Sequence, residues 1–259
     1  MKPRLLLVPS FTELEWGIRP ELEQWAEVAS FDTPGVGDEA LPDGLEAADP
    51  GRASDLLPRW REAAARRGLE EVDRRDWERF IVVADSHGTP TGVRLARERP
   101  SAVVGMAIGH ASLSHGTEGE RAPMRAGIWE AMVQLAQQGG ESFVRYGIAQ
   151  MTRGGVDEET AAKMMERFPD LEVVGAMVQA LGTEPEPIGD ELAALGLPLL
   201  FAKHEGCLAR TDEGFEDIVA AFPEAETAIC PETCTASPTF AEALHGFARR
   251  LDATALGNR

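Results

Sequence analysis

The chain has 259 residues, of which 43% are hydrophobic, enough to bury a core as one large α/β domain with an insertion or as two small domains. Its 44 acidic and 25 basic side chains give a formal net charge of −19, which repels nucleic-acid phosphates and anionic membrane surfaces. The apolar run from Leu5 to Val8 is far too short for a signal-peptide core or a membrane span, so we expect a cytoplasmic protein with no nucleic-acid or membrane partner.

The chain alternates short apolar runs with segments of helical periodicity. In order, the sequence predicts a strand at 4–8, a helix at 20–26, a strand at 27–31, a surface loop at 32–51, a helix at 55–77, a strand at 80–84, a helix at 90–99 and a strand at 102–108. After an interruption the alternation resumes with a strand at 197–202, a helix at 213–222, a strand at 226–230 and a helix at 238–251. This order predicts an α/β fold whose mostly parallel sheet of about six strands is covered by helices on both faces.

The interruption, residues 115–187, shows helical spacing only. We interpret it as a helical cap inserted into a core formed by residues 1–114 and 188–259. Its Met and aromatic side chains recur every three or four residues, among them Trp129, Met132, Leu135, Phe143, Tyr146, Met164, Met165 and Phe168. Such a stripe is ordinarily helix core, although Met-rich walls also adapt to apolar ligands.

The strand at 80–84 runs directly into small-x-Ser-x-Gly and then into a helix. Ala84 and Gly88 flank Ser86, and small residues at these two positions permit a sharp strand-to-helix turn that holds the serine in a strained backbone conformation. The pattern predicts a nucleophile elbow, with the Ser86 hydroxyl exposed at the edge of the sheet.

Together with two further motifs, the elbow resembles the α/β-hydrolase family over nearly the whole chain outside the cap. The stretch Leu5-Leu6-Leu7-Val8-Pro9-Ser10-Phe11 resembles the first strand and oxyanion loop, and Asp32-Thr33-Pro34-Gly35-Val36-Gly37 matches the family's Asp-x-Pro-Gly-x-Gly turn. The resemblance implies Ser86 as nucleophile, the backbone N–H groups of His87 and Phe11 as oxyanion hole, and no organic cofactor. Ligands would bind at the carboxyl ends of the strands, beneath the cap.

The sequence departs from the family pattern at three places. Pro9-Ser10 stands where many members have His-Gly, Glu205-Gly206 falls where the acid is expected, and Cys234-Thr235 falls where the Gly-His pair is expected. His245 lies inside the closing helix, where we expect a structural or surface residue. The serine therefore lacks its usual base and needs another one.

Histidines at other strand ends could supply that base, namely His87, His110 and His204. Because neighbouring strands are about 4.8 Å apart, these positions should lie along one edge within roughly 10 Å of each other. We expect His204 or His110 to act as general base toward Ser86, with Glu205 as the orienting carboxylate and Asp85 as the other carboxylate in reach. The sequence thus predicts a hydrolase of small carboxylic esters or related acyl substrates, with a displaced triad.

Four alternatives remain open at this point. One is a zinc or iron enzyme with His87, His110, His204 and Glu205 as ligands, although their spacing is not that of a local metal motif and the main hypothesis includes no metal. A second is a role for Cys207, Cys230 or Cys234 as nucleophile or ligand, against the ordinary reading as inert buried thiols.

The other two alternatives are not enzymes. The fold could survive as a catalytically degenerate binder of a small apolar ligand, or as an interaction subunit with the cap closed. The sequence has no Gly-x-Gly-x-x-Gly between a strand and a helix, which argues against a nucleotide cofactor. The expected partner is therefore a small molecule, and a homodimer is among the assemblies that the sequence allows.

Overall fold

The structure, a computed structural model, describes residues 2–41, 53–110, 134, 140–153, 155–167, 188–206 and 212–257. Its strands are β1 (Arg4–Val8), β2 (Glu27–Ser30), β3 (Phe80–Asp85), β4 (Val103–Gly109), β5 (Leu199–His204) and β6 (Glu226–Cys230). Its helices are α1 (Arg19–Trp25), α2 (Ala53–Arg74), α3 (Thr89–Glu98), α5 (Gly140–Arg153), α6 (Glu158–Glu166), α8 (Ile188–Ala194), α9 (Asp212–Ala221) and α10 (Pro238–Gly257). Short 3₁₀ turns are η1 (Glu13–Glu15), η3 (Ser86–Gly88) and η4 (Cys234–Ala236).

The strands form one six-stranded sheet in the order β2-β1-β3-β4-β5-β6, and every pairing between neighbours is parallel. The predicted α/β class and parallel sheet are confirmed. Because all strands run the same way, the residues that follow β1, β3, β4, β5 and β6 meet at one edge of the sheet. The register pairs Asp85 with Gly109 and Gly109 with Ala202, which sets Ser86, His110 and His204 at nearly the same level along that edge.

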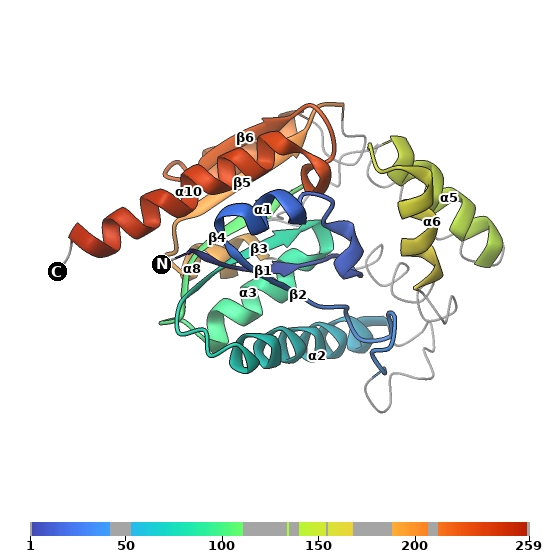
Figure 1. Cartoon of the computed structure of the whole chain (residues 1–259), viewed down its shortest axis with the longest axis horizontal. Coiled ribbons are helices and arrows are strands. Elements are labelled where there is room, and N and C mark those ends of the chain that lie inside the picture. The colour runs from blue at the N-terminus through green and yellow to red at the C-terminus, as the bar shows by residue number, and fades with distance from the viewer. Residues whose placement is uncertain are drawn as a thin grey trace.

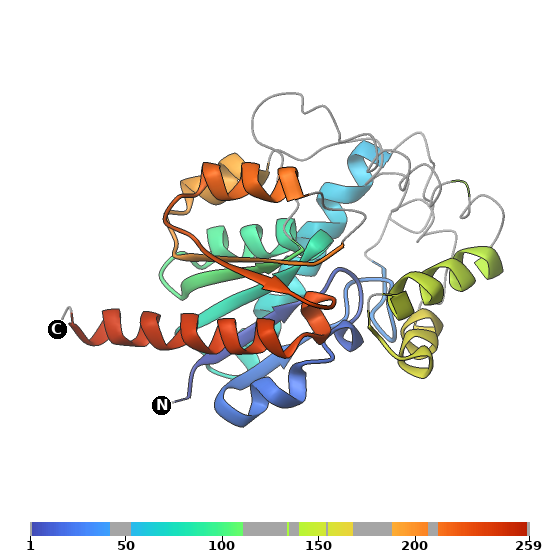
Figure 2. The ribbon, with the colours of Figure 1, turned by 90° about the horizontal axis from the view of Figure 1, so that it is seen from above.

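Helices cover both faces of the sheet (Figures 1 and 2). Side chains alternate between the two faces along each strand, so each face carries apolar side chains that pack against helices. Leu6 and Val8 of β1 belong to a core shared with α2, α3, α8 and α9. Leu5 and Leu7 point to the other side and belong to a second core, shared with α1 and α10. These two layers hold the strands rigidly beneath the edge where the candidate residues lie.

The predicted insertion contains α5 and α6, which pack against each other beyond the carboxyl ends of the strands in both views (Figures 1 and 2). Helix α6 also contacts η1, next to the loop that follows β1. Met164 and Met165 of α6 are buried, as expected of helix core. The cap boundaries 115 and 187, the side chain of Phe143, and Trp129, Met132, Leu135 and Phe168 lie outside what the structure describes.

The expected elements agree with the structure to within a few residues at most ends, and β6 matches at both. The sequence did not predict α8, a seven-residue helix next to the cap, because the whole stretch up to residue 187 looked helical and 188–196 was left unassigned. Helix α10 extends to Gly257, beyond its expected end at 251. In the part of the chain described above, no helix is long and apolar enough to cross a membrane.

Candidate active site

Ser86 occupies a strained turn directly after β3. Its φ is +43°, in the left-handed region that non-glycine residues rarely adopt. Gly88 makes the turn possible, because a Cβ atom there would lie 2.6 Å from the carbonyl oxygens of Val8 and Pro9. This strand, turn and helix have the geometry expected of an elbow, which presents Ser86 at the carboxyl edge of the sheet.

Asp85, the residue before the serine, is the carboxylate that contacts a histidine. Its Oδ1 atom lies 2.7 Å from Nδ1 of His110, and the Asp85 side chain is buried. The hydroxyl of Ser10 donates to the carbonyl oxygen of Asp85 at 3.1 Å and, more weakly, to Oδ2 at 3.5 Å. The departure Pro9-Ser10 thus has a structural consequence, because a glycine at position 10 would have no hydroxyl to hold Asp85.

His110 in turn contacts His204. The Nε2 atom of His110 lies 2.7 Å from Nδ1 of His204, and the two rings meet edge to face with centroids 4.9 Å apart. The backbone N–H of Cys234 points at the same Nε2 atom from 3.5 Å, and a backbone N–H can only donate. The Nε2 atom of His110 is therefore an acceptor, and the proton of this ring resides on Nδ1, facing Asp85.

These roles fix the tautomer of His204. Since Nε2 of His110 accepts, Nδ1 of His204 must carry the proton of their shared hydrogen bond, which leaves the lone pair of His204 on Nε2. The pKa of His204 is lowered to about 4. Burial is the largest cause, and the lowering by the neighbouring His110 exceeds the raising by Asp85. His204 is thus neutral at neutral pH and has one nitrogen able to accept a proton.

The other sequence-predicted residues make contacts of different kinds. Glu205 is exposed, and its backbone N–H bonds to the carbonyl oxygen of Cys230 at 2.8 Å. The His87 ring packs toward Phe11, with centroids 6.4 Å apart. His245 stacks on Trp25 at 4.5 Å, which fits the structural role expected of it. The carboxylate beside the histidine pair is therefore Asp85, whereas sequence reasoning had favoured Glu205.

The loop expected to supply an oxyanion donor holds an internal carboxyl group. The N–H of Phe11 donates to Oε1 of Glu15 at 2.8 Å, and those of Ser10 and Thr12 donate to the same carboxyl group at 2.7 and 3.1 Å. Desolvation, with a further contribution from Asp85, raises the pKa of Glu15 to about 8. Sequence reasoning missed Glu15, although Thr12-x-x-Glu15 is a capping-box pattern that could have indicated it.

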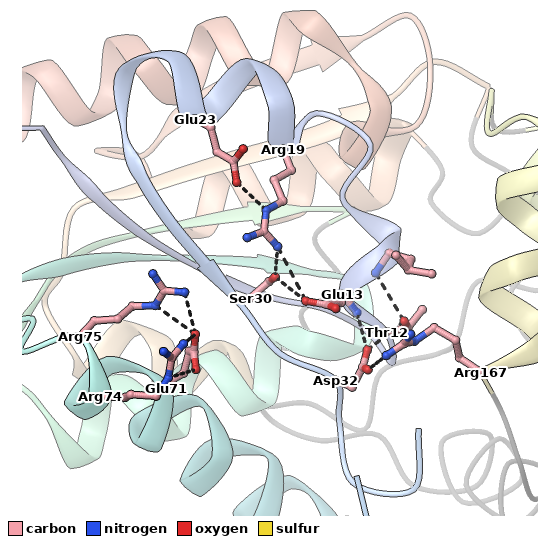
Figure 3. A network of polar contacts seen from close by, with 11 residues as sticks. Thr12, Glu13, Arg19, Glu23, Ser30, Asp32, Glu71, Arg74, Arg75 and Arg167 are labelled. Atoms are coloured by element: carbon pink, nitrogen blue, oxygen red, sulfur yellow. Dashed lines mark hydrogen bonds and ion pairs between the residues drawn. The ribbon is translucent and has the colours of Figure 1, made fainter. Parts of the chain in front are cut away.

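Asp32 of the predicted Asp-x-Pro-Gly-x-Gly turn joins this loop to the end of α6 (Figure 3). Its Oδ1 atom accepts from the Thr12 hydroxyl at 3.0 Å and from the Glu13 N–H at 2.9 Å. Its Oδ2 atom pairs with the guanidinium of Arg167, directly after α6. The carbonyl oxygen of Arg167 also accepts from the N–H of Gly37 at 2.7 Å, so both ends of the turn contact the same cap residue.

The two cysteines that the structure describes are enclosed in the core. Cys230 and Cys234 are free and fully buried, and Cys207 lies outside the described residues. A hydrogen bond between the two thiols lowers the pKa of Cys230 and raises that of Cys234. Burial of both side chains fits the ordinary reading as inert thiols.

The metal alternative gains no support from the arrangement of side chains. Among the residues that the structure describes, no group of three or more His, Cys, Asp or Glu side chains is placed to hold a metal ion. Both ring nitrogens of His110 are engaged by Asp85 and His204. The donor set expected from the sequence is therefore not assembled.

No family model matches the sequence, and a comparison with curated proteins found no match. Solved structures are similar to it. A hydrolase from Oleispira antarctica aligns over 96% of this chain and 92% of its own with a TM-score of 0.73 and 14% identity. A thermophilic esterase from Thermogutta terrifontis aligns over 97% and 91% with a TM-score of 0.68 and 16% identity.

A third similar structure belongs to a protein with different chemistry. A haloalkane dehalogenase loop variant from Bradyrhizobium elkanii aligns over 100% of this chain and 92% of its own, with a TM-score of 0.66 and 14% identity. These identities are too low to transfer an activity, but the coverage and the parallel sheet identify the architecture. The chain therefore has the α/β-hydrolase fold.

Proposed function

We propose that this protein is a serine hydrolase that cleaves a small carboxylic ester or a related acyl substrate through Ser86. The observation that carries the proposal is the hydrogen-bonded chain from Asp85 through His110 to His204, at the edge where Ser86 occupies a strained turn. The similar folds of an esterase and a hydrolase support the same reaction class. The chain of hydrogen bonds supplies what the sequence pattern lacked, a base with an orienting carboxylate.

In this mechanism His204 is the base and the other two residues orient it. Nε2 of His204 takes the proton of the Ser86 hydroxyl while Oγ bonds to the carbonyl carbon and the carbonyl oxygen becomes an oxyanion. As the tetrahedral intermediate collapses, the ester C–O bond breaks and the alcohol leaves with the proton from His204. A water molecule then gives a proton to His204 and attacks the acyl-enzyme, and collapse returns that proton to Ser86 and releases the acid.

The positive charge that forms on His204 can be transferred to His110. Its Nδ1 proton can pass along the hydrogen bond to Nε2 of His110, which places the imidazolium beside the Asp85 carboxylate.

The test is covalent labelling with a fluorophosphonate, followed by the intact mass of the protein. The probe phosphonylates an activated serine with loss of fluoride, so it needs no knowledge of the substrate. We expect one adduct on wild type, none on Ser86→Ala, and wild-type labelling of Ser101→Ala, which removes an exposed serine before β4. An adduct that persists on Ser86→Ala, or no adduct on wild type, contradicts the proposal.

A second candidate function is binding of a small apolar ligand without turnover. The observation that favours it is the Phe11 N–H, which already donates to Glu15 rather than standing open toward a substrate. Such a binder would give saturable fluorescence enhancement of 1-anilinonaphthalene-8-sulfonate and no fluorophosphonate adduct. Labelling of Ser86 would decide for the hydrolase.

A further inference from the structure

Glu15 makes contacts that the proposed reaction does not use. Its carboxyl group accepts hydrogen bonds from successive backbone N–H groups of the loop after β1, those of Ser10, Phe11 and Thr12. Successive N–H groups that converge on one point form an anion-binding concavity, the arrangement that also stabilises oxyanions. An internal carboxyl group therefore already fills the loop that the proposed mechanism needs.

Desolvation and Asp85 disfavour a negative charge on Glu15 more than the N–H groups of the loop favour one. The residue keeps some exposure, but its carboxyl end faces the backbone of the loop and is desolvated, which raises its pKa to about 8 with a further contribution from Asp85 of β3. On the other side of Thr12 stands Asp32, whose charge is matched by Arg167 of the cap. Glu13, on the same turn, faces Arg19 and Ser30 instead. At neutral pH the Glu15 carboxyl group is thus mostly protonated.

We propose that Glu15 is a positioning residue of the oxyanion loop, whose carboxyl group holds this loop in shape at rest and must release the Phe11 N–H when an oxyanion forms. This inference rests on the proposed function, since it assigns the Phe11 N–H to the developing negative charge. A protonated carboxyl group is a weak acceptor and gives up the N–H readily. An ionised one is a strong acceptor and also repels the oxyanion.

The inference has a consequence in the pH dependence of the reaction. Above pH 8 the ionised Glu15 competes for the Phe11 N–H, so reaction at Ser86 should slow with increasing pH, by roughly tenfold between pH 8 and 9.5. Glu15→Gln keeps a carbonyl oxygen that can accept from the loop but never carries a charge. The variant should therefore not slow in this range.

The experiment measures the second-order rate of fluorophosphonate labelling from pH 6 to 10 for wild type, Glu15→Gln and Glu13→Gln. Glu13→Gln is the matched control, because it removes a carboxylate from the same turn without touching the loop amides. We expect an alkaline decrease centred near pH 8 in wild type and in the control, and a flat profile for Glu15→Gln. A purely structural role of Glu15 would lower all rates of the variant equally and leave the alkaline decrease in place.

The outcomes separate this inference from the proposed function. If wild type labels at Ser86 without an alkaline decrease in rate, only the inference is overturned. This result does not depend on the folding of any variant. The inference alone is likewise overturned if Glu15→Gln keeps the decrease. If neither wild type nor Glu15→Gln forms an adduct at any pH, the proposed function is overturned, and the release step with it. An adduct on Glu15→Gln but not on wild type also overturns both, because a protonated Glu15 should release the Phe11 N–H and allow wild type to label below pH 8.

Discussion

Nε2 of His110 lies 2.7 Å from Nδ1 of His204, and Nδ1 of His110 lies 2.7 Å from a carboxylate oxygen of Asp85. The middle ring thus uses both nitrogens, one as donor and one as acceptor, and all proton positions along the chain follow from that. The basic atom at the end is Nε2 of His204. In the proposed mechanism, roles that are ordinarily divided between an aspartate and one histidine are divided between an aspartate and two.

Asp85→Asn should slow fluorophosphonate labelling of Ser86 by roughly 100-fold or more. The amide carries no charge to stabilise the imidazolium, and its NH₂ group can force Nδ1 of His110 to accept, which reverses the donor pattern along the pair. Labelling rates at pH 7 check this. Glu205→Gln is the matched control, because it neutralises the exposed carboxylate next to His204 and should label like wild type. Equal losses in both variants would contradict the assignment of Asp85.

The acid limb of the labelling rate should have its midpoint near pH 4, rather than near 6.5, because burial depresses the pKa of His204. Below that pH the ring is protonated and cannot take the serine proton, so the rate should fall about tenfold per pH unit. A profile measured from pH 3.5 to 7.5 tests this, and a midpoint above 6 would argue against His204 as base.

The same depressed pKa affects stability with a definite sign. Between pH 6.5 and 4 the unfolded chain binds a proton at His204 and the folded protein does not, so the contribution of this residue is fully present above pH 6.5 and is lost as the pH falls to about 4. His204→Gln should remove this part of the acid destabilisation in urea titrations at pH 7, 5.5 and 4. An unchanged difference between wild type and variant across these pH values would be inconsistent with a half-buried, neutral His204.

The sequence was sufficient for the fold because each strand is a short apolar run and each helix has its own periodicity. It also predicted the edge of the sheet where His110 and His204 meet, since parallel strands end together. Which carboxylate would join them was not predictable, because that depends on the turn at Ser86 and on Ser10, which reaches across from β1 to hold Asp85. Sequence distance favoured Glu205, the direct neighbour of His204, but the chain after β5 leaves it exposed.

Glu15 illustrates a second limit. Its capping-box pattern is visible in the sequence, but the turn that it caps spans only Glu13–Glu15 and gives no periodic signal. That its carboxyl group also bonds to the N–H groups of Ser10 and Phe11 depends on the path of the loop, which no local pattern encodes. The contacts that make Glu15 relevant to the proposed oxyanion hole could therefore be found only in three dimensions.

Gly109→Ala should damage the site from the adjacent strand. An added Cβ atom would lie 2.8 Å from Oδ1 of Asp85 and 3.1 Å from Cβ of Cys234, so the Asp85 carboxylate or the strand must shift and disturb the contact with His110. We expect slower labelling at Ser86 and a loss of about 1 to 3 kcal/mol of unfolding free energy. Gly17→Ala is the control, since its Cβ atom would meet Ala236 at 3.5 Å, an ordinary contact. Wild-type labelling of Gly109→Ala would contradict a role for the position of Asp85.

Arg167→Gln should loosen the contact between cap and oxyanion loop. The buried Asp32 would lose a charged donor and keep those of Thr12 and Glu13, which predicts a loss of about 1 to 2 kcal/mol in urea denaturation. Labelling should also slow, because Thr12 adjoins Phe11. Lys163→Gln breaks the exposed pair with Glu159 on α6 and should change neither quantity measurably. A variant of Arg167 that behaves like the Lys163 control would show that the pair does not support the loop.

His245→Ala separates a structural histidine from a catalytic one. The ring stacks on Trp25 with centroids 4.5 Å apart and planes 19° apart, so its removal should cost about 1 kcal/mol of stability. The rate of fluorophosphonate labelling at pH 7 should stay at the wild-type value, in contrast to a loss in His204→Gln. If His245→Ala lost labelling while it remained folded, the base would lie on α10 rather than at the end of β5, and the chain from Asp85 to His204 would have to be reinterpreted as a packing feature of the strand ends.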